Sequence, residues 1–297
     1  MDLSDTRVLQ KTDSIIAVNT QIPLLIDSQY IVHHALLTLL RDARINHDYT
    51  FDTICRVTQK KWLRKPGCER WHLKNQPDIN LRNTIITACQ KLSMFDSIYP
   101  LYNNYQYILI LGTTLECVIK KWIFFLGLIH QGYQFENVII LGSDRKLDKL
   151  IENESAYNEL LVSKYFVNSR IAHLGLTEMN MMHAVIELTR PQLLSSLSIS
   201  YINTPLQSDA KGILRRPNTA DTFITWLSTA PLSGTICVLS MQPDVGYQDM
   251  VARTHIPQTF TIHTAGPSCK PDDVTDTELL DTIARWIYQT QKYYQSF

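Results

Sequence analysis

The sequence has no excess of charge of either sign, because 28 Lys and Arg residues balance 28 Asp and Glu residues. Broad binding to DNA or RNA needs a basic face, so this balance argues against a nucleic-acid partner. Long apolar runs are also missing. The most apolar stretch, Trp122–Ile129, is far shorter than the roughly 20 residues that a membrane span needs. We interpret it as a buried helix face and expect no membrane span.

The first residues, MDLSDTRVLQKTDS, contain no apolar core segment of the kind found in secretory signal peptides. The six cysteines are scattered and form no C-x-x-C pair, a pattern typical of free thiols in a reducing compartment. We therefore expect a cytoplasmic protein, or one that is exported without a conventional signal peptide.

Several motifs of cofactor and catalytic sites are absent. The sequence contains no H-E-x-x-H and no paired Cys and His set, so it predicts no metal-ligating residues. It contains neither G-x-G-x-x-G nor G-x-x-x-x-G-K-[ST], which excludes the usual dinucleotide fingerprint and the P-loop. The G-x-S-x-G elbow of α/β-hydrolases is missing too.

What remains is the composition of a packed globular protein, with 45% hydrophobic and 19% charged residues in 297. Up to about residue 100 the apolar residues recur at helical spacing, in segments 28–45 and 78–95. After residue 100, apolar strand-like runs alternate with helical segments. The runs are 105–112, 135–142, 197–203, 234–240 and 258–264.

Apolar strands that alternate with helices indicate a parallel sheet covered on both faces. We predict an α/β fold: a Rossmann-like, doubly wound, mostly parallel sheet of about five strands over residues 101–297. A helical region over residues 1–100 precedes it, as a lid or a partner surface. Ligands of such sheets bind beyond the carboxyl ends of the strands, so the residues after each strand are the candidates for a site.

Polar side chains follow the first two predicted strands: Thr113, Thr114, Ser143, Asp144 and Arg145. A helix start after the first strand offers free N–H groups to an anion, although a capped helix alone explains the threonines. Arg145 can bind a phosphate or carboxylate through its fork, or form a local pair with Asp144, and Glu152 or Glu154 can orient it. Glu178 is favoured at the next helix start by the helix dipole.

The stretch RRPNTADTFITWL, residues 215–227, begins another helix. Asn218 or Thr219 is a suitable cap, and Asp221 falls in the first turn. Capping does not explain Arg215 and Arg216, because cations are unfavourable at a helix N-terminus. Their partner is either a ligand phosphate or Asp221. After the fourth strand, Gln242, Tyr247 and Gln248 supply neutral hydrogen-bonding groups that suit a base, ribose or sugar.

The runs YILILG, GYQFENVIILGSDR, ISYIN, PNTADTFITWL and GTICVLSMQP resemble the YdcF/SanA-like α/β family over roughly residues 105–265. The chain has GSDR where members carry a double glycine, and Asp221-Thr222 where they carry Glu-Asn. The resemblance implies a Rossmann-like fold and a pocket for a nucleotide-like compound. Members have been linked to bacterial envelope processes and to S-adenosylmethionine-type ligands.

Two functions follow from these patterns. The first is a hydrolase or group transferase that acts on a phosphorylated or nucleotide-like compound, with S-adenosylmethionine, a nucleotide or a divalent metal as possible cofactors. The predicted catalytic carboxylates are Asp144, Glu154, Glu178 and Asp221. The predicted ligand-binding residues are Thr113, Thr114, Ser143, Arg145, Arg216, Asn218, Thr219, Gln242, Tyr247 and Gln248.

The second function is a non-catalytic interaction protein, such as an exported bacterial effector, that binds a protein partner through the N-terminal region. Its contact residues would be Trp62, Arg64, Arg70 and Trp71, which are of the types enriched at interaction hot spots. Alternatively this segment is a lid, and Arg70 joins the ligand site.

Overall fold

The computed structural model describes residues 21–27, 29–65, 68–70, 73, 79–162, 170–191, 197–209 and 212–296. The chain forms two compact units. Unit 1 comprises residues 1–99, 241–254 and 266–297, and unit 2 comprises residues 100–240 and 255–265. This division differs from a contiguous split at residue 100, because the C-terminal helix packs in one apolar core with the N-terminal helices.

Unit 1 is helical in its described part. Its helices are α2 (His34–Asp42), α3 (Phe51–Lys61), α4 (Ile79–Lys91), α9 (Val245–His255, of which His255 is assigned to unit 2), η4 (Pro271–Asp273) and α10 (Asp276–Gln295). α10 begins with a capping box between Thr275 and Glu278. It buries Leu279, Ile283 and Ile287 at helical spacing against the core that α2, α3 and α4 share.

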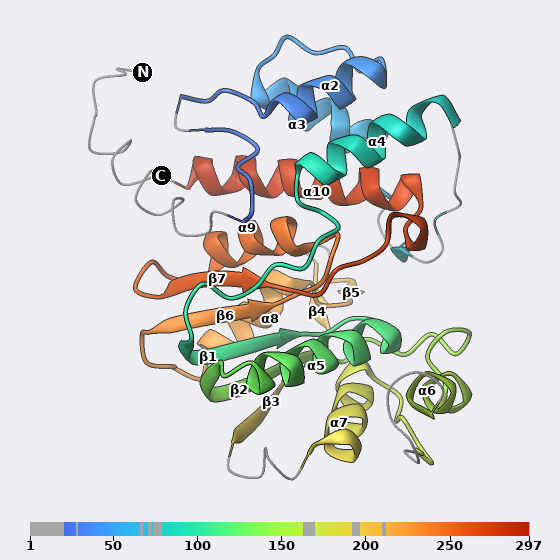
Figure 1. Ribbon diagram of the computed structural model, residues 1–297, viewed down its shortest axis with the longest axis vertical. Helices are drawn as coiled ribbons and strands as arrows, with labels where there is room; N and C mark the ends of the chain where they lie inside the picture. The colour runs from blue at the N-terminus through green and yellow to red at the C-terminus, as the bar shows by residue number, and fades with distance from the viewer. Residues whose placement is uncertain are drawn as a thin grey trace. The chain divides into compact units, whose positions relative to one another are not determined.

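Unit 2 is built on one parallel sheet of five strands, in the order β3-β2-β1-β6-β7 (Figure 1). The strands are β1 (Asn104–Leu111), β2 (Gln134–Ser143), β3 (Ser198–Thr204), β6 (Thr235–Leu239) and β7 (Thr261–Ala265). All four pairings between neighbouring strands are parallel. The predicted fold class is therefore confirmed, and each predicted strand overlaps the one observed.

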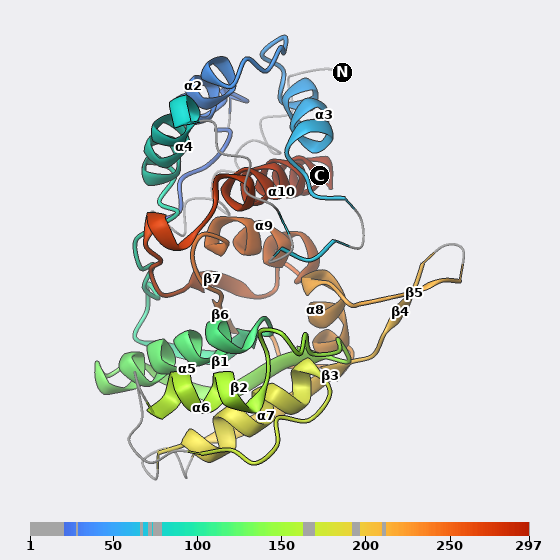
Figure 2. The same ribbon diagram turned by 90° about the vertical axis from the view of Figure 1, so that its right-hand side faces the viewer.

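Both faces of this sheet are covered. The helices of unit 2 are α5 (Leu115–His130), α6 (Glu154–Leu160), α7 (Glu178–Thr189) and α8 (Thr219–Leu227). Ile108 and Ile110 of β1 share a core with apolar residues of α5 and α7. Tyr107, which alternates with them, meets Trp226 of α8 with ring centroids 5.5 Å apart. α7 and α8 accordingly lie on opposite sides of the sheet (Figure 2), which makes the unit doubly wound.

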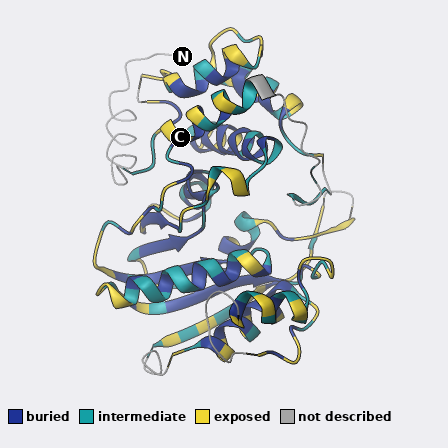
Figure 3. Cartoon of the chain, turned by 45° about the vertical axis from the view of Figure 1, so that its right-hand side comes forward, coloured by how far each residue is buried: buried dark blue, intermediate teal, exposed yellow. Residues whose placement is uncertain are grey.

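Two features of unit 2 were not expected from the sequence. A short antiparallel hairpin, β4 (Gln207–Ser208) and β5 (Leu214–Arg215), separates β3 from α8 and projects from the unit (Figure 2). Strand β3 has mostly exposed or half-buried residues, whereas β1 and β2 are largely buried (Figure 3).

No helix in the described part of the chain is long and apolar enough to cross a membrane.

Candidate functional site

The strand order of unit 2 marks one place where a ligand site is expected. The chain runs outward from β1 through β2 to β3 and then returns to place β6 on the other side of β1. In open parallel sheets the crevice lies at such a reversal, beyond the carboxyl ends of the strands. α5 begins directly after β1, with Thr114 as its N-cap residue.

The start of α5 differs from that of the other capped helices in unit 2. Asn153, Thr177 and Asn218 each accept a hydrogen bond from an amide in the first turn of their own helix, whereas the Thr114 side chain makes no such bond. Cys117 lies one turn further along. Burial raises the pKa of its thiol, and a hydrogen bond with the Thr114 side chain acts in the opposite direction. Thr113 or Thr114 was predicted to cap this helix; Thr114 occupies the N-cap position, but its side chain makes no capping hydrogen bond.

Arg145 lies at the centre of a buried ionic cluster beyond the end of β2. Its Nη1 and Nη2 atoms donate to both carboxylate oxygens of Glu152 at 2.8 and 2.7 Å. Its Nε donates to Oε1 of Glu178 at 3.3 Å. Nη1 also reaches the Lys146 carbonyl, and Nη2 the Thr113 carbonyl, at 3.3 and 3.1 Å. All five N–H groups of this guanidinium are therefore engaged within the protein.

The electrostatics of this cluster follow from its contacts. Burial is the largest influence on Arg145 and acts to lower its pKa. The hydrogen bonds and charges of Glu152 and Glu178 outweigh it and raise the pKa above the ordinary value. The carboxylate that pairs with Arg145 through both oxygens is Glu152, not the neighbouring Asp144, and the pair is buried. The role of Arg145 that this geometry supports is to tie the β2 loop to α7.

Glu178, the first residue of α7, contacts the ends of two strands. Its Oε2 accepts a hydrogen bond from the Ser143 hydroxyl at 2.7 Å. A Cβ atom added to Gly112 would lie 2.7 Å from the Glu178 carboxylate, and one added to Gly142 would lie 2.9 Å from Met179. Gly112, directly after β1, and Gly142, the last but one residue of β2, therefore make room for the first turn of α7. Sequence reasoning treated these glycines as strand ends only.

The remaining predicted carboxylates have different surroundings. Asp144 is half-buried, and its Oδ1 accepts a hydrogen bond from Asn203 at the end of β3 at 2.8 Å. Glu154 lies on the exposed side of α6, 3.5 Å from His173. Asn203 was not predicted, and its position at the end of β3 is the signal that could have identified it.

Side chains at the start of α8 bind one another and the first-turn amides of the helix. Asn218 and Asp221 form a capping box. Arg215 donates from Nη1 and Nη2 to Asp221 at 2.6 and 3.0 Å, and Arg216 is exposed beside it. The pairing of Arg215 with Asp221 was one of the two predicted alternatives. Thr219 is the first residue of the helix and is half-buried.

Gln242, Tyr247 and Gln248 belong to unit 1. Gln242 is buried and donates from Nε2 to the carbonyls of Ser93 and Asp96. The Arg285 guanidinium lies over the Tyr247 ring, 5.9 Å from its centroid. The Oε1 atoms of Gln242 and Gln248 are buried and have no hydrogen-bond partner among the described residues.

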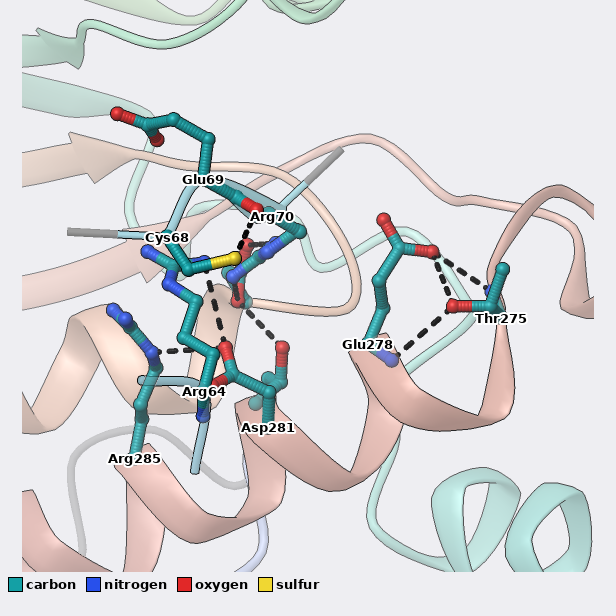
Figure 4. Close-up of polar contacts among 10 residues, drawn as sticks. Arg64, Cys68, Glu69, Arg70, Thr275, Glu278, Asp281 and Arg285 are labelled. Carbon is teal, nitrogen blue, oxygen red and sulfur yellow. Dashed lines mark hydrogen bonds and ion pairs between the residues drawn. The ribbon is translucent and has the colours of Figure 1, made fainter. Parts of the chain in front are cut away.

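The segment predicted as a partner surface is used inside unit 1. Trp62 is 9% exposed and belongs to the core. The Arg64 amide donates to Asp281 at 2.9 Å, and Arg285 reaches the same carboxylate (Figure 4). Arg70 forms a two-bond ion pair with Asp244, and Thr282 donates to that carboxylate as well. Trp71 lies outside the described residues.

Within the described residues, no three His, Cys, Asp or Glu side chains are grouped so that they could hold a metal ion.

Comparison of the chain with models of known protein families, with curated proteins and with solved structures finds no match. The resemblance to the YdcF/SanA-like family therefore stays a prediction, and the site is interpreted from its own geometry.

Proposed function

We propose that unit 2 binds a small phosphorylated or nucleotide-like compound at the carboxyl edge of its sheet and acts on it as a hydrolase or group transferase. The observation that carries this proposal is the start of α5. It follows β1 at the reversal of strand order, and its N-cap side chain makes no bond to the helix amides. Those amides and the positive end of the helix dipole favour an anionic group of the ligand.

The predicted anion ligand Arg145 takes an indirect part in this proposal. Its guanidinium is fully used by protein acceptors, and one of them is the carbonyl of Thr113, next to the N-cap of α5. By holding that carbonyl, Arg145 fixes the backbone that leads into the helix. The anion is then bound by backbone N–H groups, and Arg216 is an exposed cation elsewhere on this unit.

Asp144 is the carboxylate best suited to act as a general base. One of its oxygens accepts a bond from Asn203, and the side chain is only half-buried. β1 and β2 are adjacent, with Leu111 opposite Leu141, and β2 continues two residues further to Ser143, so Asp144 follows the strand beside the one that leads into α5. In this proposal the ligand held at α5 extends toward Asp144. Asp221 is engaged by Arg215 and its own capping box, which disfavours it for this role.

A single substitution separates helix stability from anion binding. Thr114→Asp places a carboxylate where the anion is proposed to bind. Because Asp is a strong N-cap residue, the ligand-free protein should gain up to about 1 kcal/mol of stability. The same carboxylate should abolish binding of the ligand. The measurement is thermal unfolding of the full chain with inorganic phosphate, nucleotides, S-adenosylmethionine and sugar phosphates in turn. A compound at a hundredfold excess over Kd stabilises the native state by about 2.7 kcal/mol.

The matched control is Thr50→Asp, the same exchange at the N-cap of α3 in unit 1, where Thr50 already accepts a bond from the Thr53 amide. It should leave any ligand-induced shift intact. If no phosphorylated compound stabilises the wild-type chain, or if the shift survives in Thr114→Asp, the proposal is wrong.

The alternative, a protein partner bound through residues 62–71, has less support. The arginines at positions 64 and 70 are held by Asp281 and Asp244, and Trp62 is buried. Residues that complete a protein's own core do not offer a free interaction surface. A pull-down with Arg70→Ala tests this alternative, which requires loss of a partner without unfolding of unit 1.

A further inference from the structure

Strand β3 is the last strand at one edge of the parallel sheet (Figure 1), and within the described part of the chain it pairs with β2 alone. The carbonyl of Thr204 accepts a hydrogen bond from the amide of Asp144, directly after β2. The backbone N–H and C=O groups of one strand residue point to the same side, and successive residues alternate. Since those of Thr204 point toward β2, those of Ile199, Tyr201 and Asn203 point outward from the sheet.

This edge lacks the features with which proteins usually block an exposed strand, namely charged side chains, prolines and bulges. Residues 198–204, SISYINT, are all neutral and include no proline. Their register with β2 runs through all seven residues without interruption. Pro205 follows directly and has no N–H to donate. The edge is therefore open to another strand along the whole length of β3.

The sequence of β3 matches a second copy of itself. In an antiparallel pair with a two-fold axis at Tyr201, this residue faces the same residue of the second copy, and Ile199 faces Asn203. All three residues point outward, so each facing pair can exchange both of its N–H···O bonds. No like charges meet within the paired strands, because β3 carries none.

The charges beside the two ends of β3 have opposite sign. At its start, Arg190 donates from Nη2 to the carbonyl of Leu197 at 2.8 Å. Near its end, Oδ1 of Asp144 accepts a hydrogen bond from Asn203 at 2.8 Å. An antiparallel copy brings the start of one β3 beside the end of the other. The guanidinium end of each copy then faces the carboxylate end of its partner, and this complementarity favours a second copy as the occupant of the edge.

We propose that two copies of the chain associate through β3, which joins their sheets into one continuous sheet across a two-fold axis. Such an interface uses the same surface of both copies, as in most homodimers. It extends the sheet sideways and leaves the carboxyl ends of the strands open. The dimer is therefore independent of the proposed ligand site.

The experiment measures the mass of the full chain by light scattering over about a hundredfold range of protein concentration. The expected result is a rise from 34.2 kDa toward twice that value.

Ser200→Lys tests the interface. Ser200 is exposed and its backbone groups point toward β2, so the exchange leaves the outward groups of Tyr201 in place. In the dimer the two introduced ammonium groups would lie diagonally across the two-fold axis, and lysine is a common block to the pairing of edge strands. The variant should weaken association at least about tenfold.

The matched control is Ser233→Lys, the same exchange at an exposed serine in the loop before β6. It adds the same charge away from β3 and should leave the dimer intact. Hydrogen exchange supplies a test that needs no variant. The amides of Ile199, Tyr201 and Asn203 should exchange more slowly at high protein concentration than at low concentration.

A wild-type chain that stays monomeric at every concentration overturns the proposal. So does a dimer that Ser200→Lys forms with unchanged affinity, because the two copies then associate through another surface. If Ser200→Lys does not fold, hydrogen exchange of the wild-type chain decides the question. Exchange of the three amides at a rate independent of concentration would show that β3 is not the interface.

Discussion

Two arginines of unit 2 lie in loops beside the sheet, and the structure gives them opposite settings. Arg145 is buried, with 8% of its side chain exposed, and its guanidinium bonds to two carboxylates and two carbonyls. Arg215 has 41% of its side chain exposed and pairs with the Asp221 carboxylate. Each arginine binds one carboxylate through both Nη atoms, Glu152 for Arg145 and Asp221 for Arg215, so these two ion pairs differ mainly in burial.

Burial decides what each pair contributes. In a buried cluster, removing one partner strands the other charges in a medium of low polarity, and the loss is large. At the surface, water and salt screen the pair, and holding two long side chains costs entropy, so the contribution is small. The comparison of the two arginines shows that a cation and a carboxylate in the sequence do not by themselves determine how much their ion pair stabilises the protein.

The largest expected effect is that of Arg145→Ala. It leaves Glu152 and Glu178 buried without their cation, and the expected loss of unfolding free energy is about 3–5 kcal/mol. Denaturant unfolding of the wild-type and variant chains measures it. A double variant, Arg145→Met with Glu152→Met, should lose less than Arg145→Ala, because it removes one of the stranded charges. A loss below 1 kcal/mol for Arg145→Ala would show that the cluster is solvated like the Arg215 pair.

A second prediction tests how tightly the cluster is packed. In Gly112→Ala the new Cβ would lie 2.7 Å from the Glu178 carboxylate, which Ser143 and Arg145 hold in place. The expected loss is about 1–3 kcal/mol, as for other overpacked sites. Thermal unfolding measures it.

The control for this prediction has the opposite sign. A Cβ added to Gly127, inside α5, would have no neighbour within 4 Å. Since alanine is the better helix former, Gly127→Ala should stabilise the protein by about 0.5–1 kcal/mol. If Gly112→Ala does not destabilise the protein, the Glu178 side chain moves freely. The two hydrogen bonds from Ser143 and Arg145 then do not hold its carboxylate in place, and the prediction is wrong.

Much of the fold could be predicted, because it follows from local patterns. The apolar run 105–112 became β1 (Asn104–Leu111), and α8 has the predicted bounds Thr219–Leu227. Apolar runs bounded by Gly and helices bounded by Asn or Thr are local signals, and they survive folding. The β4–β5 hairpin was missed because its strands are two residues each, too short to show alternation.

The site was harder to predict because its contacts join distant residues. Arg145 meets Glu178, 33 positions later, and Asp144 meets Asn203, 59 positions later. No local spacing encodes such pairs. The sequence correctly placed Arg145 and Glu178 at the ends of their elements, but it could not show that they bind each other. The grouping of α10 with the N-terminal helices escaped prediction for the same reason.

The smallest expected effect is that of Arg215→Ala. Burial acts to raise the pKa of Asp221, but the hydrogen bond and charge of Arg215 and the Asn218 amide outweigh it and lower the pKa below its ordinary value of 3.8. A carboxyl whose pKa is lowered by folding stabilises the protein at pH values above its pKa in the unfolded state. This contribution is lost as the pH falls through its pKa in the folded state.

Arg215→Ala should therefore cost at most about 1 kcal/mol of unfolding free energy at pH 7, because water and salt screen this half-exposed pair. The cost should fade below about pH 4 as Asp221 is protonated. Urea unfolding between pH 7 and pH 3 at low salt measures both. The loss of unfolding free energy in Arg215→Ala could instead be independent of pH or as large as in Arg145→Ala. Either result would show that burial is not the cause of the difference between the two arginines.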